Sequence, residues 1–502
     1  MQRYIGRIRV LTGVCVLVSL IIIGRLYYLQ VMRGDSYARR ADAQFVSTQD
    51  PLLDRGTIYF TDKDGNQITA ATLNSVASST DHQRYYPGGS LAAQELGFVA
   101  YNNDNTQKGR YGLEKYYDQV LSRTDSYSNF FVELFGGIKT AALGGEASGD
   151  IVTTIEPSVQ SELERTLVDY DASWHPDLAG GIVMDPKTGE IVAMAVSPTF
   201  DLNSFNTQSD PLIYANPMVQ NVYEMGSIIK PLTMAAGIDS GAVTENTTYN
   251  DTGCLTVDTK KICNYDFKAR GVIPMQQVLS QSLNVGASFI ATTMGQSTMR
   301  DYFLNHYKMN EETGVDLPGE IHGLVAPLQA AQQVGYDTAS FGQGIAMTPV
   351  ETMRALAVLA NGGYLVTPHL VKAITYDTGV TRDLSWGDPV PVLKPDTATT
   401  VTRMLTTVAD VALANGKDKI EHHSVAAKTG TAQIANPAGG GYYTDRYLHS
   451  FFGYFPSYDA RFAVFLFAVN PKGAPYASET WGPPFHALVQ FLINYYNIPP
   501  DR

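Results

Sequence analysis

Short apolar runs typical of buried strands occur at both ends of residues 151–497, and this arrangement limits the possible folds more than any other feature. These runs lie at 151–155, 181–185, 190–196, 426–433, 450–455 and 461–469. Helical patterns are found at 158–169, 274–308, 349–361 and 480–495. Strands at both ends of a region with helices between them predict an α+β fold, in which an antiparallel sheet is sandwiched by helices.

The composition agrees with a large globular protein. The chain has 502 residues, of which 44% are hydrophobic and 17% charged, so it can bury a substantial core in about two to four domains. The formal net charge of −13 argues against a nucleic-acid partner, because such proteins present basic surfaces to phosphate.

The N-terminus predicts a membrane anchor. Residues 1–9 are short and basic, and residues 10–31 form an apolar stretch long enough for a helix to cross a bilayer. Arg25 can extend to the interface, where tyrosines such as Tyr27 are also common. A cleaved signal peptide would need a small-x-small site, which the end of the stretch lacks, and a buried core helix is disfavoured beside a basic tail. We expect a cytoplasmic tail (1–9), a single-pass anchor (10–31), and a large domain outside the cytoplasm at the cell membrane.

Residues 32–150 predict a small pedestal between this anchor and the main domain. A hairpin turn is expected at Asp62-Lys63-Asp64-Gly65-Asn66, another turn at Tyr86-Pro87-Gly88-Gly89, and the start of a helix at Gly112. The main domain is predicted to cover residues 151–497.

Two of the three cysteines flank a second predicted hairpin. If Asp258 and Thr259 form a two-residue turn, Cys254 lies directly opposite Cys263, at a separation that suits a disulfide. The alternative is a pair of free thiols, and the disulfide requires an oxidising compartment.

Ser227 and Lys230 lie three residues apart on the first turn of a predicted helix, so both side chains can point into one space. A serine hydroxyl becomes a good nucleophile when an adjacent base takes its proton, and a buried lysine can be that base. A Ser-x-x-Lys pair alone is common on helices. Its weight comes from two motifs that follow in order, Ser282-Leu283-Asn284 and Lys428-Thr429-Gly430, the second on a predicted strand.

The three motifs together supply the parts of an acyl-transfer site. Ser227 would attack a carbonyl carbon, and Lys230 would accept its proton. Ser282 would pass a proton to the leaving amine, and Asn284 would hydrogen-bond the substrate amide and Lys230.

The third motif would hold the substrate. Lys428 would place a fixed positive charge near a substrate carboxylate and keep Lys230 neutral by repulsion, and Thr429 would hydrogen-bond that carboxylate. Gly430 would leave room for a substrate lying along the strand edge. The backbone N–H groups of Thr431 and Ser227 would form the oxyanion hole.

No cofactor or metal is expected. His422 and His423 are adjacent and therefore point to different sides of an extended chain. Asp62, Asp64 and Asn66 lack the distal glutamate of a calcium loop.

With these motifs the chain resembles the class B penicillin-binding proteins, the monofunctional peptidoglycan transpeptidases. The resemblance extends to Arg55-Gly56-Thr57-Ile58, Gly112-Leu113-Glu114, Asp185–Glu190, Phe200–Asn203, Thr313–Glu320 and Ser340–Gly344. It implies a penicillin-binding or serine β-lactamase-like transpeptidase domain that acts on peptidoglycan stem peptides ending in D-alanyl-D-alanine. It also implies acylation of Ser227 by β-lactams and pairing with a SEDS-type glycosyltransferase in a division or elongation complex.

Three departures from the family pattern are visible. Met225 replaces the usual proline, Leu283 stands where serine is common, and the segment between Asn66 and Arg84 is much shorter than usual. The part of the pedestal that binds partners in the family is therefore reduced here. Two rival functions remain at this stage, a serine β-lactamase and a non-catalytic β-lactam-binding scaffold or sensor.

Overall fold

The computed structural model describes residues 54–75, 82–101, 107–123, 148–416 and 419–502. The predicted tail (1–9) and anchor (10–31) lie outside these residues. Within the described ranges, no helix combines the length and the apolarity that crossing a bilayer requires.

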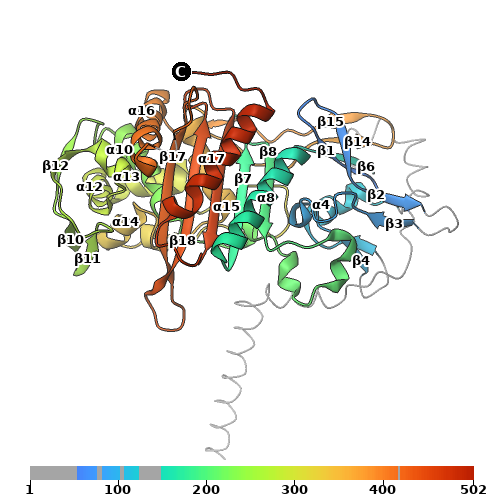
Figure 1. Ribbon diagram of the computed structural model, residues 1–502, viewed down its shortest axis with the longest axis horizontal. Coiled ribbons are helices and arrows are strands. Elements are labelled where there is room, and N and C mark those ends of the chain that lie inside the picture. Colours follow the sequence, from blue (N-terminus) through green and yellow to red (C-terminus); the bar gives the residue numbers. More distant parts are fainter. Residues whose placement is uncertain (1–53, 76–81, 102–106, 124–147, 417–418) are drawn as a thin grey trace, which may run out of the picture.

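A five-stranded antiparallel sheet forms the centre of the molecule (Figure 1). Its strands, in spatial order, are β17 (Ala426–Ala435), β18 (Tyr442–Phe455), β19 (Phe462–Val469), β7 (Leu178–Met184) and β8 (Ile191–Ser197). The first and last parts of the domain therefore meet at the β19–β7 pair, where Phe465 lies opposite Ile182. β17 is an edge strand, and its free side carries the third sequence motif.

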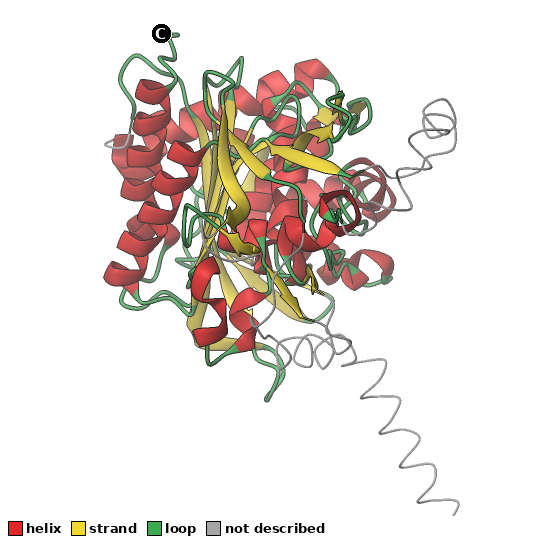
Figure 2. Ribbon diagram, turned by 90° about the vertical axis from the view of Figure 1, so that its right-hand side faces the viewer, coloured by secondary structure: helices red, strands yellow, loops and turns green. Residues whose placement is uncertain are grey.

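Helices cover both faces of this sheet (Figure 2), which confirms the predicted sandwich. α8 (Pro157–Trp174) and α17 (Ala477–Tyr495) pack together on one face, where the Tyr170 and Trp481 rings stack 3.7 Å apart. α10 (Lys230–Asp239), α15 (Pro349–Ala360) and α16 (Pro395–Thr407) contribute to the core of the other face. Alternate side chains of a strand point to opposite faces, so in β19 Val464 and Leu466 join the α8–α17 core while Phe465 and Phe467 join the other.

Shorter elements complete the helical half of the domain. They are η2 (Leu202–Thr207), η3 (Pro211–Tyr214), α9 (Pro217–Gln220), η4 (Gly226–Ile229), β9 (Thr248–Asp251), β10 (Cys254–Val257), β11 (Lys260–Cys263), β12 (Gly271–Pro274), α11 (Met275–Ser280), α12 (Asn284–Met294), α13 (Gln296–Asp301), η5 (Tyr302–His306), η6 (Ala326–Gln329), α14 (Gln333–Ala339), β13 (Tyr364–Leu365), β16 (Val390–Pro391), η7 (Val408–Ala412) and η8 (Leu413–Gly416).

A second sheet of six strands lies beside the first. Its order is β15 (Thr381–Asp383), β14 (Val371–Tyr376), β6 (Gly149–Thr153), β1 (Ile58–Thr61), β2 (Gln67–Ser75) and β3 (His82–Tyr85). β1 and β2 form the hairpin expected around Asp62–Asn66. The remaining N-terminal elements are α3 (Ala93–Leu96), β4 (Val99–Tyr101), β5 (Gln107–Gly109), α4 (Gly112–Tyr116) and α5 (Asp118–Leu121).

The predicted domain division between residues 150 and 151 stays a prediction, and it falls within strand β6 of this second sheet. β6 was expected to open the main domain, but it pairs in parallel with β1 and antiparallel with β14. β14 (Val371–Tyr376) joins this sheet from a position more than halfway along the main domain. Pattern alone identified strand β6 correctly, and only its partners show to which sheet it belongs.

A buried charge cluster holds the N-terminal elements together. Glu114 is fully buried and accepts hydrogen bonds from Arg55 Nε (2.7 Å) and Arg84 Nε (2.6 Å). Arg55 also pairs with Asp118 at 2.8 Å. Burial by itself raises the pKa of Glu114, but Arg84 and Arg55 outweigh it and hold that pKa below its usual value. The Arg55–Ile58 and Gly112–Glu114 segments, which both carry the family resemblance, are thus joined by an ion pair between Arg55 and Glu114.

We predict that Glu114→Gln lowers the free energy of unfolding by about 3 kcal/mol, because it leaves two buried guanidinium groups without their shared carboxylate. Urea denaturation of the purified protein measures this loss. Lys115→Gln, at the exposed neighbouring position, is the matched control and should leave stability unchanged. Equal stability of the Glu114 and Lys115 variants would contradict a structural role for the cluster.

Candidate active site

Ser227 lies in η4, the single turn that leads into α10. Gly226 has a φ of 66°, a left-handed conformation that glycine adopts without strain. Its N–H donates to the Gly342 carbonyl (3.1 Å), and Ser450 Oγ donates to the Met225 carbonyl (2.8 Å). Met225 has a φ of −82°, close to the value a proline ring imposes, so this departure from the family pattern leaves the turn intact.

The turn is held close against strand β17 at Gly430. A Cβ atom at Gly430 would lie 2.3 Å from Ser450 Oγ, 2.7 Å from the Met225 carbonyl oxygen and 3.1 Å from the Ile228 nitrogen. The sequence predicted that Gly430 leaves room for substrate. In the structure, that room is occupied by the turn that carries the nucleophile, so glycine is needed there for packing.

Lys230 is buried directly beneath Ser227, with 1% of its surface exposed. Its Nζ lies 3.0 Å from Ser227 Oγ, 2.6 Å from the Ser282 carbonyl oxygen and 3.2 Å from Ser282 Oγ. Burial lowers the pKa of Lys230 well below its ordinary value, and repulsion from Lys428 lowers it further. A neutral amine at this distance can accept the Ser227 proton.

Ser282 connects the two lysines. It has a φ of 55°, uncommon for a residue with a side chain, and this conformation places both its carbonyl and its hydroxyl at Lys230. Lys428 Nζ donates to Ser282 Oγ at 3.0 Å from the opposite side, and also to the Thr429 carbonyl at 2.9 Å. Ser227, Lys230, Ser282 and Lys428 therefore form one continuous hydrogen-bonded chain.

The structure modifies the role predicted for Lys428. Burial lowers the pKa of this lysine to about 7, so its positive charge is not fixed near neutral pH. Burial is also the larger cause of the lowered pKa of Lys230, with repulsion by Lys428 second. A carboxylate arriving in the cleft would favour the charged form of Lys428.

Asn284 differs from its prediction in one contact. It lies at the start of α12 and lines the cleft, but its side-chain Nδ2 donates to the Cys263 carbonyl (2.9 Å). The predicted hydrogen bond to Lys230 is not formed among the described residues. Its carboxamide oxygen stays available to a bound amide.

Thr429 and Thr431 both line the cleft from the free side of β17. The hydroxyl of Thr431 accepts a hydrogen bond from the Ala477 N–H (3.1 Å), which ties the start of α17 to this strand. The predicted oxyanion hole from the N–H groups of Ser227 and Thr431 stays a prediction.

The cleft above Ser227 has a volume of about 970 Å³ and is open to solvent on one side. Sequence reasoning missed several residues that line it, namely Tyr265, Phe267, Gln343, Tyr442 and Tyr476. Tyr265 and Tyr476 face each other edge to face across 5.8 Å, although they are far apart in sequence. No periodic pattern marks such residues, because four of them reach the cleft from loops and Tyr442 lies at the very start of β18. Gln343 lies in a segment that carried the family resemblance.

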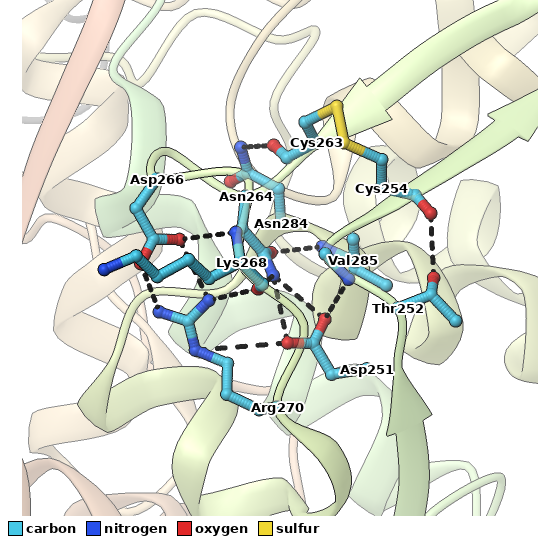
Figure 3. The surroundings of a disulfide bond; sticks show 11 residues. Asp251, Thr252, Cys254, Cys263, Asn264, Asp266, Lys268, Arg270, Asn284 and Val285 are labelled. Atoms are coloured by element: carbon cyan, nitrogen blue, oxygen red, sulfur yellow. Dashed lines mark hydrogen bonds and ion pairs between the residues drawn. A yellow bond between two sulfur atoms is a disulfide. The ribbon is translucent and has the colours of Figure 1, made fainter.

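Cys254 and Cys263 pair as the hairpin register predicts, and their sulfur atoms are 2.11 Å apart (Figure 3). The bonded pair ends the β10–β11 hairpin at the mouth of the cleft. Within the described part of the chain, no group of three His, Cys, Asp or Glu side chains could hold a metal ion.

Comparison with known proteins assigns the central region to a family. Residues 179–490 match the model described as the penicillin binding protein transpeptidase domain. This match includes all three sequence motifs and nearly all of the five-stranded sheet.

Curated relatives and solved structures cover more of the chain. Stage V sporulation protein D of Bacillus subtilis is 30% identical over 421 residues, which are 81% of this chain and 63% of that protein. The peptidoglycan D,D-transpeptidase FtsI of Escherichia coli is 27% identical over 446 residues, 86% of this chain and 71% of the relative. Penicillin binding protein 3 of Mycobacterium tuberculosis, in a crystal structure with ampicillin, is 27% identical with a TM-score of 0.77 over 90% of this chain and 97% of that one. The chain thus spans less than two thirds of the first of these relatives.

We predict that Lys428→Met shifts the acid limb of the pH profile for Ser227 acylation to higher pH, by roughly one unit. The reaction needs neutral Lys230, so its rate rises as pH rises through the Lys230 pKa. Removing the repulsion from Lys428 raises that pKa and moves the limb upward. The measurement is the rate constant for labelling with fluorescent penicillin across pH. The pH midpoint of the acid limb is the quantity to compare, because the variant also loses the hydrogen bond from Lys428 to Ser282 and its absolute rate constant will fall for that reason as well. An unshifted acid limb would refute the coupling of the two lysines.

Proposed function

The chain belongs to the class B penicillin-binding proteins, and from that premise we propose that it is a D,D-transpeptidase that cross-links peptidoglycan stem peptides. The observation that supports this most is the hydrogen-bonded chain from Ser227 through Lys230 and Ser282 to Lys428. It would supply a nucleophile, a base whose pKa is lowered by burial, and a path for the proton in one hydrogen-bonded network.

In the acylation step, Ser227 Oγ forms a bond to the carbonyl carbon of the penultimate D-alanine while its proton passes to Lys230 Nζ. Charge develops on the carbonyl oxygen, which the N–H groups of Ser227 and Thr431 would stabilise. The bond to the terminal D-alanine then breaks. Its nitrogen takes a proton relayed through Ser282 from Lys230, which returns to the neutral form, and free D-alanine leaves.

The substrate would lie against the free edge of β17. A peptide in extended conformation can hydrogen-bond an unpaired strand edge, and its side chains then alternate between cleft and solvent. The terminal carboxylate would lie near Lys428 and Thr429, where it raises the charged fraction of a lysine whose pKa is about 7. Asn284 would orient the amide of the substrate with its free carboxamide oxygen.

In the second step an amine of a neighbouring stem peptide attacks the acyl-Ser227 carbonyl. Lys230 takes a proton from this amine and gives it to Ser227 Oγ as the ester bond breaks, so the new amide forms and both the serine hydroxyl and the neutral lysine are regenerated. β-Lactams would acylate the same serine. The crystal structures of Mycobacterium tuberculosis penicillin binding protein 3 with ampicillin and aztreonam support this part of the proposal.

We expect fluorescent penicillin to label the wild-type protein covalently and stably, and Ser227→Ala to abolish the labelling. Ser240→Ala is the control and should label like wild type. Ser240 is exposed and lies at the C-terminal end of α10, the helix that follows the Ser227 turn. Labelled Ser227→Ala protein would overturn the nucleophile assignment. Loss of the label within seconds would instead indicate a β-lactamase. Growth of a deletion strain complemented by Ser227→Ala would indicate a non-catalytic scaffold.

The same proposal includes a location. The apolar stretch at 10–31 would anchor the protein as a single pass in the cell membrane, with residues 32–150 as a pedestal and the catalytic domain outside the cytoplasm. The Cys254–Cys263 disulfide supports an oxidising compartment. As the family resemblance implies, the glycan strands would come from a SEDS-type glycosyltransferase that pairs with this protein.

We predict that the full chain stays in the membrane pellet after alkaline carbonate extraction, and that protease added to intact spheroplasts digests its catalytic domain. A Leu→Arg pair at Leu17 and Leu20 should release it from the pellet or prevent its export, because charges at the centre of a membrane helix are costly. Release of the wild-type chain by carbonate, or protection from external protease, would contradict the anchor or its orientation. Co-purification with a SEDS-type protein tests the partner.

A further inference from the structure

The start of helix α12, which carries Asn284, is held by the last residue of strand β11, Cys263, and by the residue that follows it, Asn264. Asn284 Nδ2 donates to the Cys263 carbonyl (2.9 Å), and the Val285 N–H donates to Asn264 Oδ1 (3.1 Å) (Figure 3). The first N–H groups of a helix lack intrahelical partners. Leu283, the residue that precedes α12, makes no side-chain cap. Asn264 therefore satisfies a helix end at the catalytic cleft that the local sequence leaves open.

Asn264 is itself rigidly oriented. It is 1% exposed, and its Nδ2 donates to both carboxylate oxygens of Asp251, at 2.9 and 3.1 Å. Only one orientation of a carboxamide places its oxygen at an N–H and its nitrogen at a carboxylate. Asp251 is also 1% exposed, and Arg270 Nε lies 4.0 Å from it. The carboxylate thus fixes which end of the Asn264 side chain faces helix α12.

The disulfide constrains the same segment through the backbone. The β10–β11 hairpin is a separate two-stranded sheet, and such a hairpin is marginally stable alone. The Cys254–Cys263 bond closes its open end, and directly beyond it the Asn264 N–H donates to the Gly253 carbonyl (2.9 Å). The position of the Cys263 carbonyl, which Asn284 contacts, therefore depends on the covalent link.

We propose that Asn264, held by Asp251 and by the Cys254–Cys263 disulfide, is a positioning residue for Asn284 in the acylation reaction. It touches neither Ser227 nor the lysines in the described hydrogen-bond network, and acts by fixing the first turn of α12. The Asn284 side chain then keeps its nitrogen at Cys263 and its oxygen toward the substrate amide. This inference rests on the proposed function, because Asn284 matters only if a substrate amide binds there.

A double-mutant cycle separates positioning from general stability. Asn264→Ala should lower the rate constant for acylation by fluorescent penicillin about tenfold, an effect in the range expected from a small misplacement of a catalytic group. Combined with Asn284→Ala, it should cause no further loss beyond Asn284→Ala alone, because both changes remove one function. Asn250→Ala, on the adjacent strand with an exposed side chain, should react like wild type.

The disulfide is tested in a Cys15→Ser background, where Cys254 and Cys263 are the only cysteines. A water-soluble phosphine reduces the bond: the phosphine becomes its oxide with the oxygen of one water, and the two sulfur atoms gain two electrons and two protons. The acylation rate constant should fall several-fold on reduction and recover on reoxidation. It should not respond to phosphine in the Cys254→Ser/Cys263→Ser variant, which should have the lower rate throughout. This arm needs no folded Asn264 variant.

The outcomes are distinguishable from failure of the proposed function. If wild-type protein is not labelled at Ser227, the proposed function itself is wrong and the inference falls with it. If wild type is labelled but Asn264→Ala reacts at the same rate, or if its effect adds fully to that of Asn284→Ala, Asn264 does not act through Asn284. A rate constant that is insensitive to reduction would remove the disulfide from the proposal.

Discussion

The burial of Lys230 is the constraint on which the catalytic region depends. Lys230 is 1% exposed, and removing a charged ammonium group from water is costly. Such a lysine is stable only where its neutral form is favoured or where neighbouring groups accept hydrogen bonds from its amine. Here the Ser282 carbonyl accepts one hydrogen bond and the pKa of the lysine is lowered by burial and by Lys428. The burial that makes the site costly to form therefore also favours the neutral form of Lys230. Three chain segments, which carry Lys230, Ser282 and Lys428, must therefore meet in one hydrogen-bonded network.

The sheet provides the rigid frame for this convergence. β17 contributes Lys428, and β18 fixes the nucleophile turn through the hydrogen bond from Ser450 to Met225. Gly430 permits the close approach of strand and turn, since a Cβ there would collide with Ser450 Oγ and with the Met225 carbonyl that precedes η4. Because β17 is an edge strand, its outer side remains free for an extended ligand. One strand thus serves packing, electrostatics and substrate access together.

The less regular parts of the molecule support the site indirectly. The cleft wall opposite β17 comes from a small hairpin and a loop, which are held by a disulfide and by the Asn264–Asp251 contact. The N-terminal elements are held by Glu114 between two arginines, and share a sheet with residues 371–383 of the later chain. In each region a specific polar or covalent contact holds together elements that have too small an apolar core to do so alone.

The sequence by itself determined the elements with strong local patterns and the identity of the reacting groups. Apolar runs predicted the strands of the central sheet, the Asp258-Thr259 turn predicted the hairpin register that places Cys254 opposite Cys263, and motif order predicted that Ser227, Lys230, Ser282 and Lys428 would meet. Period and turn chemistry are local properties, so they can be read from neighbouring residues. The resemblance to a known family supplied the function that the spacing alone left open.

Only the tertiary structure decided the relations between distant segments. In the tertiary structure, β6 belongs to the six-stranded sheet, and the Ser227 turn fills the space beside Gly430. The Asn284 side chain donates a hydrogen bond to the Cys263 carbonyl. The tertiary structure also placed Lys428 in a deeply buried position, where desolvation lowers its pKa to about 7. Strand partners, close backbone approaches and desolvation all depend on residues far away in the chain, and a local pattern carries no information about them.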